Sequence, residues 1–298
     1  MKNSIVLILI VLFSSCCNAK KVAQDTTKPI QESTVLEEQA VAEIKTDDLV
    51  LKENTIQETE TIKAKDTIIQ KEFNQILTKT EHSNIHFLWN ELLQKHVSDN
   101  GNVNYKSFKT DHKKLLEYIH ILAILKSNPE FDSISKNEKL AYWINAYNAL
   151  TIDLIIKNYP VKSIKDIKDP WGQKLWELGD KWYSLEDIEH EILRKMDEPR
   201  IHFAIVCASY SCPKLQNTAF TASKLETQLT TATKQFLSDT KRNEIKENSL
   251  KLSKIFKWFD KDFEQNGSLI DFLNKYTDIT ISAKAKISYK YYNWDLNN

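Results

Sequence analysis

The distribution of aromatic residues and glycines most constrains what this chain can fold into. All seven tryptophans and all four glycines lie after residue 88, whereas residues 18–72 contain no aromatic residue, no glycine and one proline. Such a polar stretch, with only scattered single Val or Ile residues, cannot bury enough apolar surface to offset the entropy lost on ordering. We therefore predict a flexible tether over residues 16–80 and one globular domain over residues 81–298, which is long enough for a single core.

The first residues have the order of an export signal. Lys2 precedes the apolar run Ile5–Phe13, and two serines separate that run from Cys16, as in a signal with a basic start and a small-residue cleavage site. About nine apolar residues cannot cross a bilayer, which needs roughly twenty in a helix. The cysteine at the expected cleavage point resembles the lipobox of bacterial lipoproteins. We therefore predict a signal peptide over residues 1–15 and lipidation of Cys16, with an ordinary secretory signal as the alternative.

This N-terminus predicts where the protein resides and what it meets. Acyl chains on Cys16 would hold an exported protein on a membrane of the bacterial cell envelope. The expected partners are that membrane, reached through the lipid, and an envelope peptide, glycan or protein. The formal net charge is +0, so the chain lacks the basic excess of a nucleic-acid-binding protein, and no nucleic acid is expected as a partner. No cofactor is expected.

Local sequence signals indicate a mostly helical α+β domain. Ser135 with Glu138 three residues later forms a capping box before a long apolar run, which predicts a helix ending near Tyr159-Pro160. The run Arg200–Cys207 predicts a short buried strand. Helices are expected at 82–96, 112–126, 184–196 and 223–238, the last also opening with a capping box, and later strands at 244–252 and 280–292. We therefore predict a single domain with a small mixed or antiparallel sheet.

Cys212 is the strongest candidate for a reactive group. Pro213 follows it, and proline is favoured at the first helical position, so Cys212 is predicted at a helix N-cap, where free amides favour the thiolate. His202, on the preceding predicted strand, would lie beside Cys212 if the connection folds back, which would give the Cys–His pair of acyl transfer. Asn145 and Asn148, three residues apart on the apolar helix, would orient that histidine or donate to an oxyanion.

Structural roles could account for the same residues. Cys207 would be a small buried hydrophobe, or it would form a disulfide with Cys212, which an oxidising compartment permits. Buried asparagines more often specify a fold, and a lone histidine on a strand more often belongs to the core. Metal binding by His202, the two cysteines and His190 is disfavoured because no close-spaced ligand pairs occur, so no metal site is predicted. The charges around Glu189 are interpreted as solvated or structural.

Three tryptophans indicate a candidate ligand-binding loop. Trp171, Trp176 and Trp182 flank Gly172 and Gly179 in a segment with poor helix and strand character. In an exported protein such a loop would stack on a sugar or peptide, because aromatic faces offer a large contact area at low entropic cost. The alternative is a loop folded over the core.

Several runs of residues resemble one known family. The runs are Lys139–Thr151, Ser184–Arg194, Arg200–Cys207 with Ser211–Leu215, Ile255–Phe263 and the terminal Tyr289–Asn297. In this order they resemble the domain of unknown function 547, within a bacterial lipoprotein. The resemblance implies the extent of the domain and no reaction.

Two functions remain open from the sequence. The first is a binding or scaffold module for an envelope ligand or partner, displayed on the tether and using the tryptophan loop. The alternative is a thiol-dependent hydrolase or acyl transferase with Cys212 as the nucleophile and His202 as the base. An exposed aromatic groove without a perturbed cysteine beneath it would favour the first function, and a pocket that brings Cys212 and His202 together would favour the second.

Overall fold

Residues 85–298 are described by the structure, which is a computed structural model. The predicted signal peptide, Cys16 and the tether of residues 16–80 lie outside these described residues. Within residues 85–298, none of the helices combines the length and hydropathy needed to cross a bilayer.

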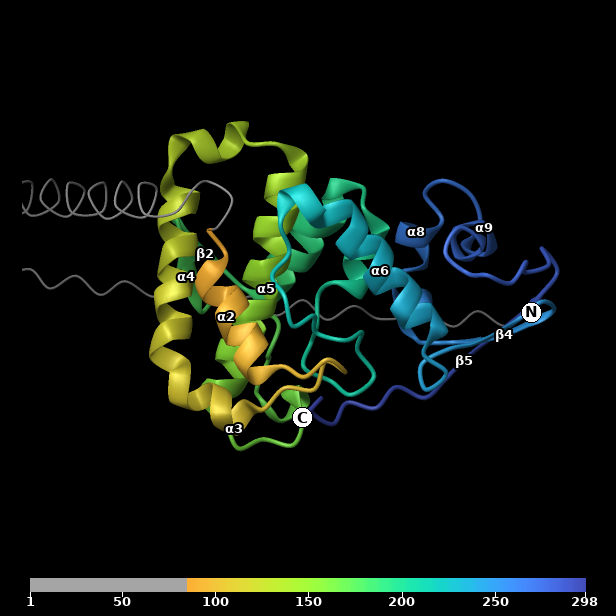
Figure 1. Cartoon of the computed structure of the whole chain (residues 1–298), viewed down its shortest axis with the longest axis horizontal. Coiled ribbons are helices and arrows are strands. Elements are labelled where there is room, and N and C mark those ends of the chain that lie inside the picture. The colour runs from red at the N-terminus through yellow and green to blue at the C-terminus, as the bar shows by residue number, and fades with distance from the viewer. Residues whose placement is uncertain (1–84) are drawn as a thin grey trace, which may run out of the picture. The chain divides into compact units, whose positions relative to one another are not determined.

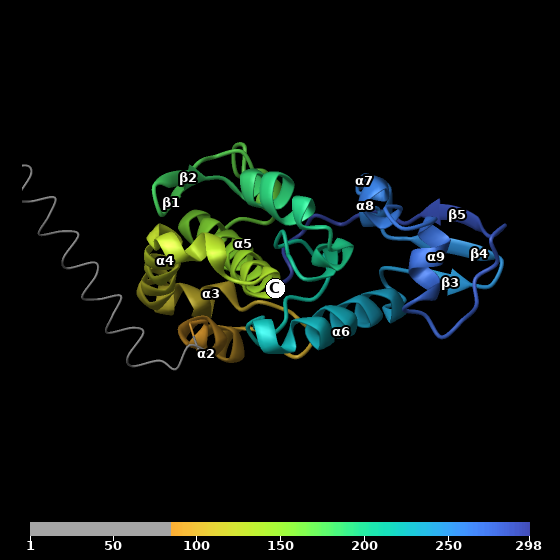
Figure 2. The same cartoon turned by 90° about the horizontal axis from the view of Figure 1, so that it is seen from above.

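Four α-helices gather at one end of the domain, and one of them is a central buried helix (Figures 1 and 2). This central helix, α5, buries every residue from Leu140 to Ile156. Its predicted capping box is confirmed: the Glu138 N–H donates to Ser135 Oγ at 3.2 Å, and the Ser135 N–H donates to the Glu138 carboxylate at 2.8 Å. The four helices are α2 (Phe87–His96), α3 (Tyr105–Phe108), α4 (His112–Ser127) and α5 (Lys136–Asn158).

Two small sheets complete the α+β fold. The first is the antiparallel hairpin of β1 (Trp176–Leu178) and β2 (Lys181–Tyr183). The second is mixed, because β4 (Ser249–Leu252) pairs antiparallel with β3 (Glu244–Lys246) and parallel with β5 (Lys286–Tyr289). The mostly helical α+β prediction with a small mixed sheet is therefore confirmed.

The mixed sheet lies at the other end of the domain from α2–α5, and α6 runs between the two ends (Figure 2). Short helices pack beside this sheet and extend the phenylalanine-rich part of the core, in which Phe263 contacts Phe203, Phe256 and Phe272. The helices of this half are α6 (Leu225–Ser238), α7 (Ile255–Trp258), α8 (Asp260–Phe263) and α9 (Leu269–Asn274).

Tight helical turns connect the main elements. The expected helix over residues 184–196 is instead a π-helix, η4 (Asp187–Ile192), followed by the 3₁₀ turn η5 (Leu193–Met196). Single-turn π-helices occur frequently at functional sites. The other 3₁₀ turns are η1 (Lys109–Asp111), η2 (Pro129–Ser133), η3 (Ile164–Asp166), η6 (Pro199–Phe203) and η7 (Ala222–Lys224).

The predicted strand at residues 200–207 is wrong. Pro199 opens the 3₁₀ turn η6, and the residues after Phe203 are irregular. The Asn148 side chain takes the place of a strand partner: its amide donates to Ala204 O, and its carbonyl oxygen accepts from the Val206 N–H, both at 2.9 Å. A side chain of α5 therefore satisfies buried backbone groups that a neighbouring strand would otherwise satisfy.

Two predicted helix starts are also wrong. Pro213 opens no helix, so Cys212 is not an N-cap; its N–H donates to Ser209 O within a turn. Helix α6 begins at Leu225 without a side-chain cap. The Glu226 carboxylate, expected to complete that second capping box, instead accepts from the buried Arg200 guanidinium.

Candidate functional site

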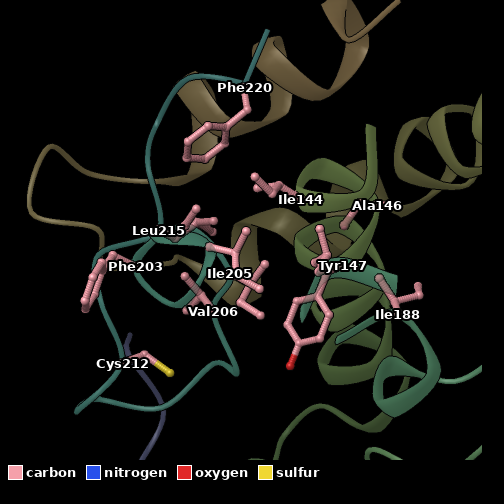
Figure 3. Close-up of a cluster of buried hydrophobic side chains, with 14 of the residues drawn as sticks. Ile144, Ala146, Tyr147, Ile188, Phe203, Ile205, Val206, Cys212, Leu215 and Phe220 are labelled. Carbon is pink, nitrogen blue, oxygen red and sulfur yellow. The ribbon is translucent and has the colours of Figure 1, made fainter. Parts of the chain in front are cut away.

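One pocket brings the reactive residues of the sequence together. It has a volume of about 240 Å³ and is walled mainly by aromatic and aliphatic side chains. Figure 3 shows Cys212 and Tyr147 in the buried cluster that backs this region. The pocket is lined by Tyr147, Trp171, Glu189, His190, His202, Ile205, Cys207, Cys212, Pro213, Ile255, Trp258, Phe259, Tyr292 and Trp294.

The side chains of Cys207, Ser209 and Tyr292 surround the Cys212 sulfur. We name these three residues, together with Cys212, the thiol cluster. The two Sγ atoms lie 2.7 Å apart, and both cysteines are free. The Ser209 and Tyr292 hydroxyls each lie 3.2 Å from Cys212 Sγ, and the Cys207 backbone N–H donates to it at 3.2 Å. Because Ser209 donates its proton to Tyr292 at 2.9 Å, the phenol proton is free to point at Cys212.

A turn closed by the C-terminal segment positions the thiol cluster. Ala208 adopts a left-handed conformation with φ 58°, which turns the chain so that Cys212 returns to Cys207. The following residues pair with the end of the chain: the Tyr210 N–H donates to Asp295 O at 2.6 Å, and the Asn297 N–H donates to Ala208 O at 3.1 Å. Residues 293–297 therefore hold the turn in place.

The thiol cluster shifts the pKa values of its two cysteines in opposite directions. Burial raises the pKa of Cys212, but hydrogen bonds from Cys207 and Tyr292, together with the contacts to Ser209, outweigh it and lower the pKa from 9.0 to about 6. The hydrogen bond to Cys212 and burial raise the pKa of Cys207 well above its ordinary value. At neutral pH the arrangement therefore favours a Cys212 thiolate that accepts from a Cys207 thiol.

His202 is held by a carboxylate that the sequence analysis missed. Its Nε2 lies 2.8 Å from Asp262 Oδ2, and its ring stacks on Phe259 with centroids 4.0 Å apart. Asp262 also accepts two hydrogen bonds from Arg194, at 2.6 and 2.8 Å. Burial raises the pKa of Asp262, but the bonds from Arg194 and His202 outweigh it and lower that pKa.

The Asp262 contact also fixes the protonation of His202. Burial lowers the pKa of His202 more than Asp262 raises it, so the ring is neutral. Because a carboxylate only accepts, Nε2 carries the ring proton and Nδ1 is the basic nitrogen.

Glu189 is a half-buried residue on the pocket wall. The Tyr147 hydroxyl donates to Glu189 Oε2 at 3.0 Å. Burial raises the pKa of Glu189, against the opposing effects of His190, Tyr147 and Arg194, so this carboxyl keeps its proton to a higher pH than an ordinary glutamate does. The π-helix η4 places Glu189 and His190 on the pocket together, although they are consecutive in sequence.

The interpretation of these charges as merely solvated or structural needs correction. Glu189 is half-buried in the pocket wall, and Arg194 forms an ion pair with Asp262 of α8. Arg194 also donates to His190 Nδ1 at 2.7 Å. Spacing within residues 184–194 gave no signal for this, because the partner lies 68 residues away.

The predicted catalytic residues are only partly brought together. Cys212 and His202 line the same pocket, and their hydrogen bonds go to different partners, the thiol cluster and Asp262 respectively. Cys212 is 3% exposed, so the pocket provides its access. Asn145 bonds to the backbone N–H and C=O of Phe220, and Asn148 bonds to backbone near residue 205. Both amides are thus engaged with backbone, and Asp262 is the group that orients His202.

The three tryptophans of the predicted ligand-binding loop are separated. Trp171 lines the pocket and packs edge-on against Trp294, with centroids 5.7 Å apart. Trp176 is buried, and its indole N–H donates to Asp153 at 2.6 Å. Trp182 is 51% exposed and does not line the pocket. The loop therefore supplies one tryptophan to the pocket, α5 supplies Tyr147, and the C-terminal part of the domain supplies the other aromatic walls.

The described residues contain no cluster of side chains suited to binding a metal ion. Across residues 85–298, no three His, Cys, Asp or Glu side chains are grouped so that they could hold a metal ion.

Comparison with known proteins gives one relationship. No curated protein and no solved structure matches the chain significantly. Residues 131–237 match the model of a family described as "Protein of unknown function, DUF547". The matched region contains α5, Glu189, His202 and both pocket cysteines, whereas Asp262 and Tyr292 follow it. The match supports, over residues 131–237, the family resemblance seen in the sequence.

Proposed function

We propose that this protein is a thiol-dependent enzyme that hydrolyses or transfers acyl groups, with Cys212 as its nucleophile. The observation that carries the proposal is the convergence of hydrogen-bond donors on the Cys212 sulfur inside an aromatic-walled pocket. These donors favour the thiolate, which is the nucleophilic form of cysteine. The same pocket contains an oriented neutral imidazole, which is the usual partner of such a nucleophile.

The proposed reaction has two stages. The Cys212 thiolate attacks the acyl carbonyl carbon, and collapse of the tetrahedral intermediate breaks the bond to the leaving group and forms a thioester. The Glu189 carboxyl, whose pKa is raised by burial, is the proposed proton donor to that leaving group. In the second stage, His202 Nδ1 takes a proton from water or an acceptor alcohol as that oxygen attacks the thioester, and the Cys212 thiolate is released.

The pocket is suited to an uncharged acyl group. Arg194 is neutralised by Asp262, and burial lowers the pKa of His202, which favours the uncharged imidazole. A substrate carboxylate would therefore meet no free cation in the pocket wall and would face the Cys212 thiolate. Apolar and aromatic walls favour an aliphatic or aromatic acyl group through burial of its surface.

The location and partners are proposed from the N-terminal sequence. A lipid on Cys16 would attach the enzyme to a bacterial envelope membrane, where an acylated peptide, glycan or protein would be its substrate. The binding or scaffold module remains the second candidate, because an aromatic pocket also suits a ligand that is held without reaction. The separation of Trp171, Trp176 and Trp182 moves the binding site of that candidate from the loop to the pocket.

Acylation of the full chain by p-nitrophenyl butyrate and p-nitrophenyl benzoate tests this proposal. We expect a transient acyl adduct on Cys212, found by peptide mass mapping, which is absent in Cys212→Ser and persists longer in His202→Asn. Cys207→Ser keeps a hydroxyl donor beside Cys212 and should still acylate there, at a lower rate than the wild type. Saturable ligand binding without an adduct on Cys212, or adducts on lysines alone, would favour the binding module and contradict the enzyme.

A further inference from the structure

The two pocket cysteines are arranged as a pair rather than as a nucleophile with an incidental neighbour. Their Sγ atoms lie 2.7 Å apart on either side of a short turn, so bond formation between them requires little movement of the side chains. Cys207 is partly exposed and Cys212 is buried, and both line the pocket. An incoming group in the pocket can therefore reach both sulfurs in turn.

The surroundings of the pair assign a different role to each sulfur. Cys212 Sγ accepts from the Cys207 N–H and from the Tyr292 hydroxyl, which stabilises it as a thiolate and as a leaving group. Cys207 Sγ has longer contacts, at 3.4 Å to Ser209 and 3.5 Å to Tyr292. The raised pKa of Cys207 agrees with a sulfur that keeps its proton until the first thiol has reacted. This asymmetry is typical of an attacking cysteine with a resolving partner.

We infer that Cys207 and Cys212 form a redox-active dithiol that reduces disulfide bonds of peptides bound in the pocket. The Cys212 thiolate attacks one sulfur of the substrate disulfide, forming a mixed disulfide and releasing the other half as a thiolate. The Cys207 thiol then gives its proton to that released thiolate, and the Cys207 sulfur attacks Cys212. The products are a Cys207–Cys212 disulfide, one substrate thiol and one substrate thiolate, with two electrons passed from the protein to the substrate.

The walls of the pocket favour a peptide disulfide with apolar neighbours over a charged one. Trp258 and Trp294 stack with centroids 5.8 Å apart, and Tyr292 lies against both rings, at 4.8 and 4.7 Å. Trp258 is 44% exposed, so this aromatic group is accessible beside the cysteines. Its faces suit an apolar side chain next to the substrate cysteine, whereas carboxylates would face the Cys212 thiolate unpaired.

Two disulfide probes and the full chain test the inference. The apolar probe is the disulfide-linked dimer of N-acetyl-Phe-Cys-amide, and the charged probe is oxidised glutathione. Trypsin cleavage after Arg200 and Lys214 gives a peptide that carries Cys207 and Cys212 and no other cysteine. Its mass distinguishes the dithiol, the mixed disulfide and the internal disulfide, whatever happens at Cys16 and Cys17.

In the wild-type chain we expect the peptide to lose two hydrogens and the probe to release both halves as thiols. Cys207→Ser should stop at a mixed disulfide on Cys212, and Cys212→Ser should form no internal disulfide. The apolar probe should react about tenfold faster than oxidised glutathione, because one phenyl ring becomes buried in the pocket. A persistent mixed disulfide in the wild type, or no reaction, would overturn the dithiol role, and equal rates would overturn the peptide preference.

The outcome is independent of acyl transfer. Cys207→Ser loses the resolving thiol but keeps a hydroxyl donor beside Cys212, so it should still acquire an acyl group on Cys212, more slowly than the wild type, if the proposed enzyme is correct. A chain that exchanges disulfides and takes no acyl group would support the dithiol and contradict the acyl enzyme. The reverse result would contradict the dithiol alone. Circular dichroism of each variant, together with a thermal melt, establishes that the comparison is made between folded proteins.

Discussion

Replacing Tyr292 with phenylalanine should raise the pKa of Cys212. The phenol oxygen lies 3.2 Å from Cys212 Sγ, and phenylalanine keeps the ring while removing the hydroxyl. A hydrogen bond to a charged group contributes roughly 1.5–3 kcal/mol, which corresponds to about one to two pKa units. We therefore expect the pKa of Cys212 to rise from about 6 to about 7–8 in Tyr292→Phe.

The assay is the rate of alkylation of Cys212 by iodoacetamide across a pH series, followed by peptide mass under reducing conditions. At pH 7 the thiolate fraction should fall from about nine-tenths to between about one-half and one-tenth. A thiol with a higher pKa gives a more nucleophilic thiolate, with a Brønsted slope of about 0.4–0.5. This higher reactivity offsets the smaller thiolate fraction of Tyr292→Phe, so the alkylation rate at a single pH changes little. The midpoint of the pH profile is therefore the readout.

Tyr291→Phe is the matched control, because Tyr291 is the neighbouring tyrosine and is 83% exposed. Its alkylation midpoint should equal that of the wild type. The reasoning is refuted if Tyr292→Phe leaves the midpoint unchanged while a thermal melt shows the variant folded, or if both variants move it equally. Either result would mean that the phenol of Tyr292 does not stabilise the thiolate.

Three further substitutions test what holds the domain together. Asp262→Asn leaves the Arg194 cation without its partner and should lower the free energy of unfolding by about 3 kcal/mol at pH 7. The pKa of Asp262 in the folded protein lies below its ordinary value of 3.8, so this stabilisation is present above pH 3.8 and is lost as the pH falls towards the folded pKa. The difference in urea midpoint between the wild type and Asp262→Asn should therefore narrow from about pH 5 to about pH 3. A difference that stays constant over this range would contradict the ion pair. Asn148→Ala leaves two buried backbone groups unpaired and should cost about 2–4 kcal/mol in urea unfolding, well above the cost of Asn158→Ala, which removes one local bond. Ser135→Ala should cost about 1 kcal/mol by thermal melt, and Ser135→Thr should recover most of it; equal melts for the two would argue against the cap.

The parts of the fold that were predicted correctly depend on neighbours in sequence. Helix α5 follows from a capping box and a long apolar run, both of which act within a few residues. The alternating strands near residues 244–252 are found for the same reason, as the hairpin of β3 and β4. Local signals of this kind can be recognised in the sequence without knowledge of the tertiary contacts.

The parts that were missed depend on partners far away in the chain. Residues 200–207 have the composition of a strand, but the Asn148 amide satisfies their backbone from 58 residues earlier. The acidity of Cys212 depends on Tyr292, 80 residues later, and the orientation of His202 depends on Asp262, 60 residues later. The sequence analysis found Cys212 as a reactive cysteine for a reason that the structure replaces, because hydroxyl and thiol donors take the place of the predicted helix N-terminus.

The pairing of residues 293–297 with the turn at residues 208–211 has a consequence for biosynthesis. A nascent chain that has been translated through Cys212 already contains both cysteines, His202 and Glu189, but it lacks the phenol of Tyr292 and the backbone acceptors that hold the turn at residues 208–211. Its Cys212 would behave as an ordinary thiol, mostly protonated at neutral pH. The reactive sulfur is therefore created only when about 80 further residues have been made and folded back, so the chain carries no activated thiol during most of its synthesis.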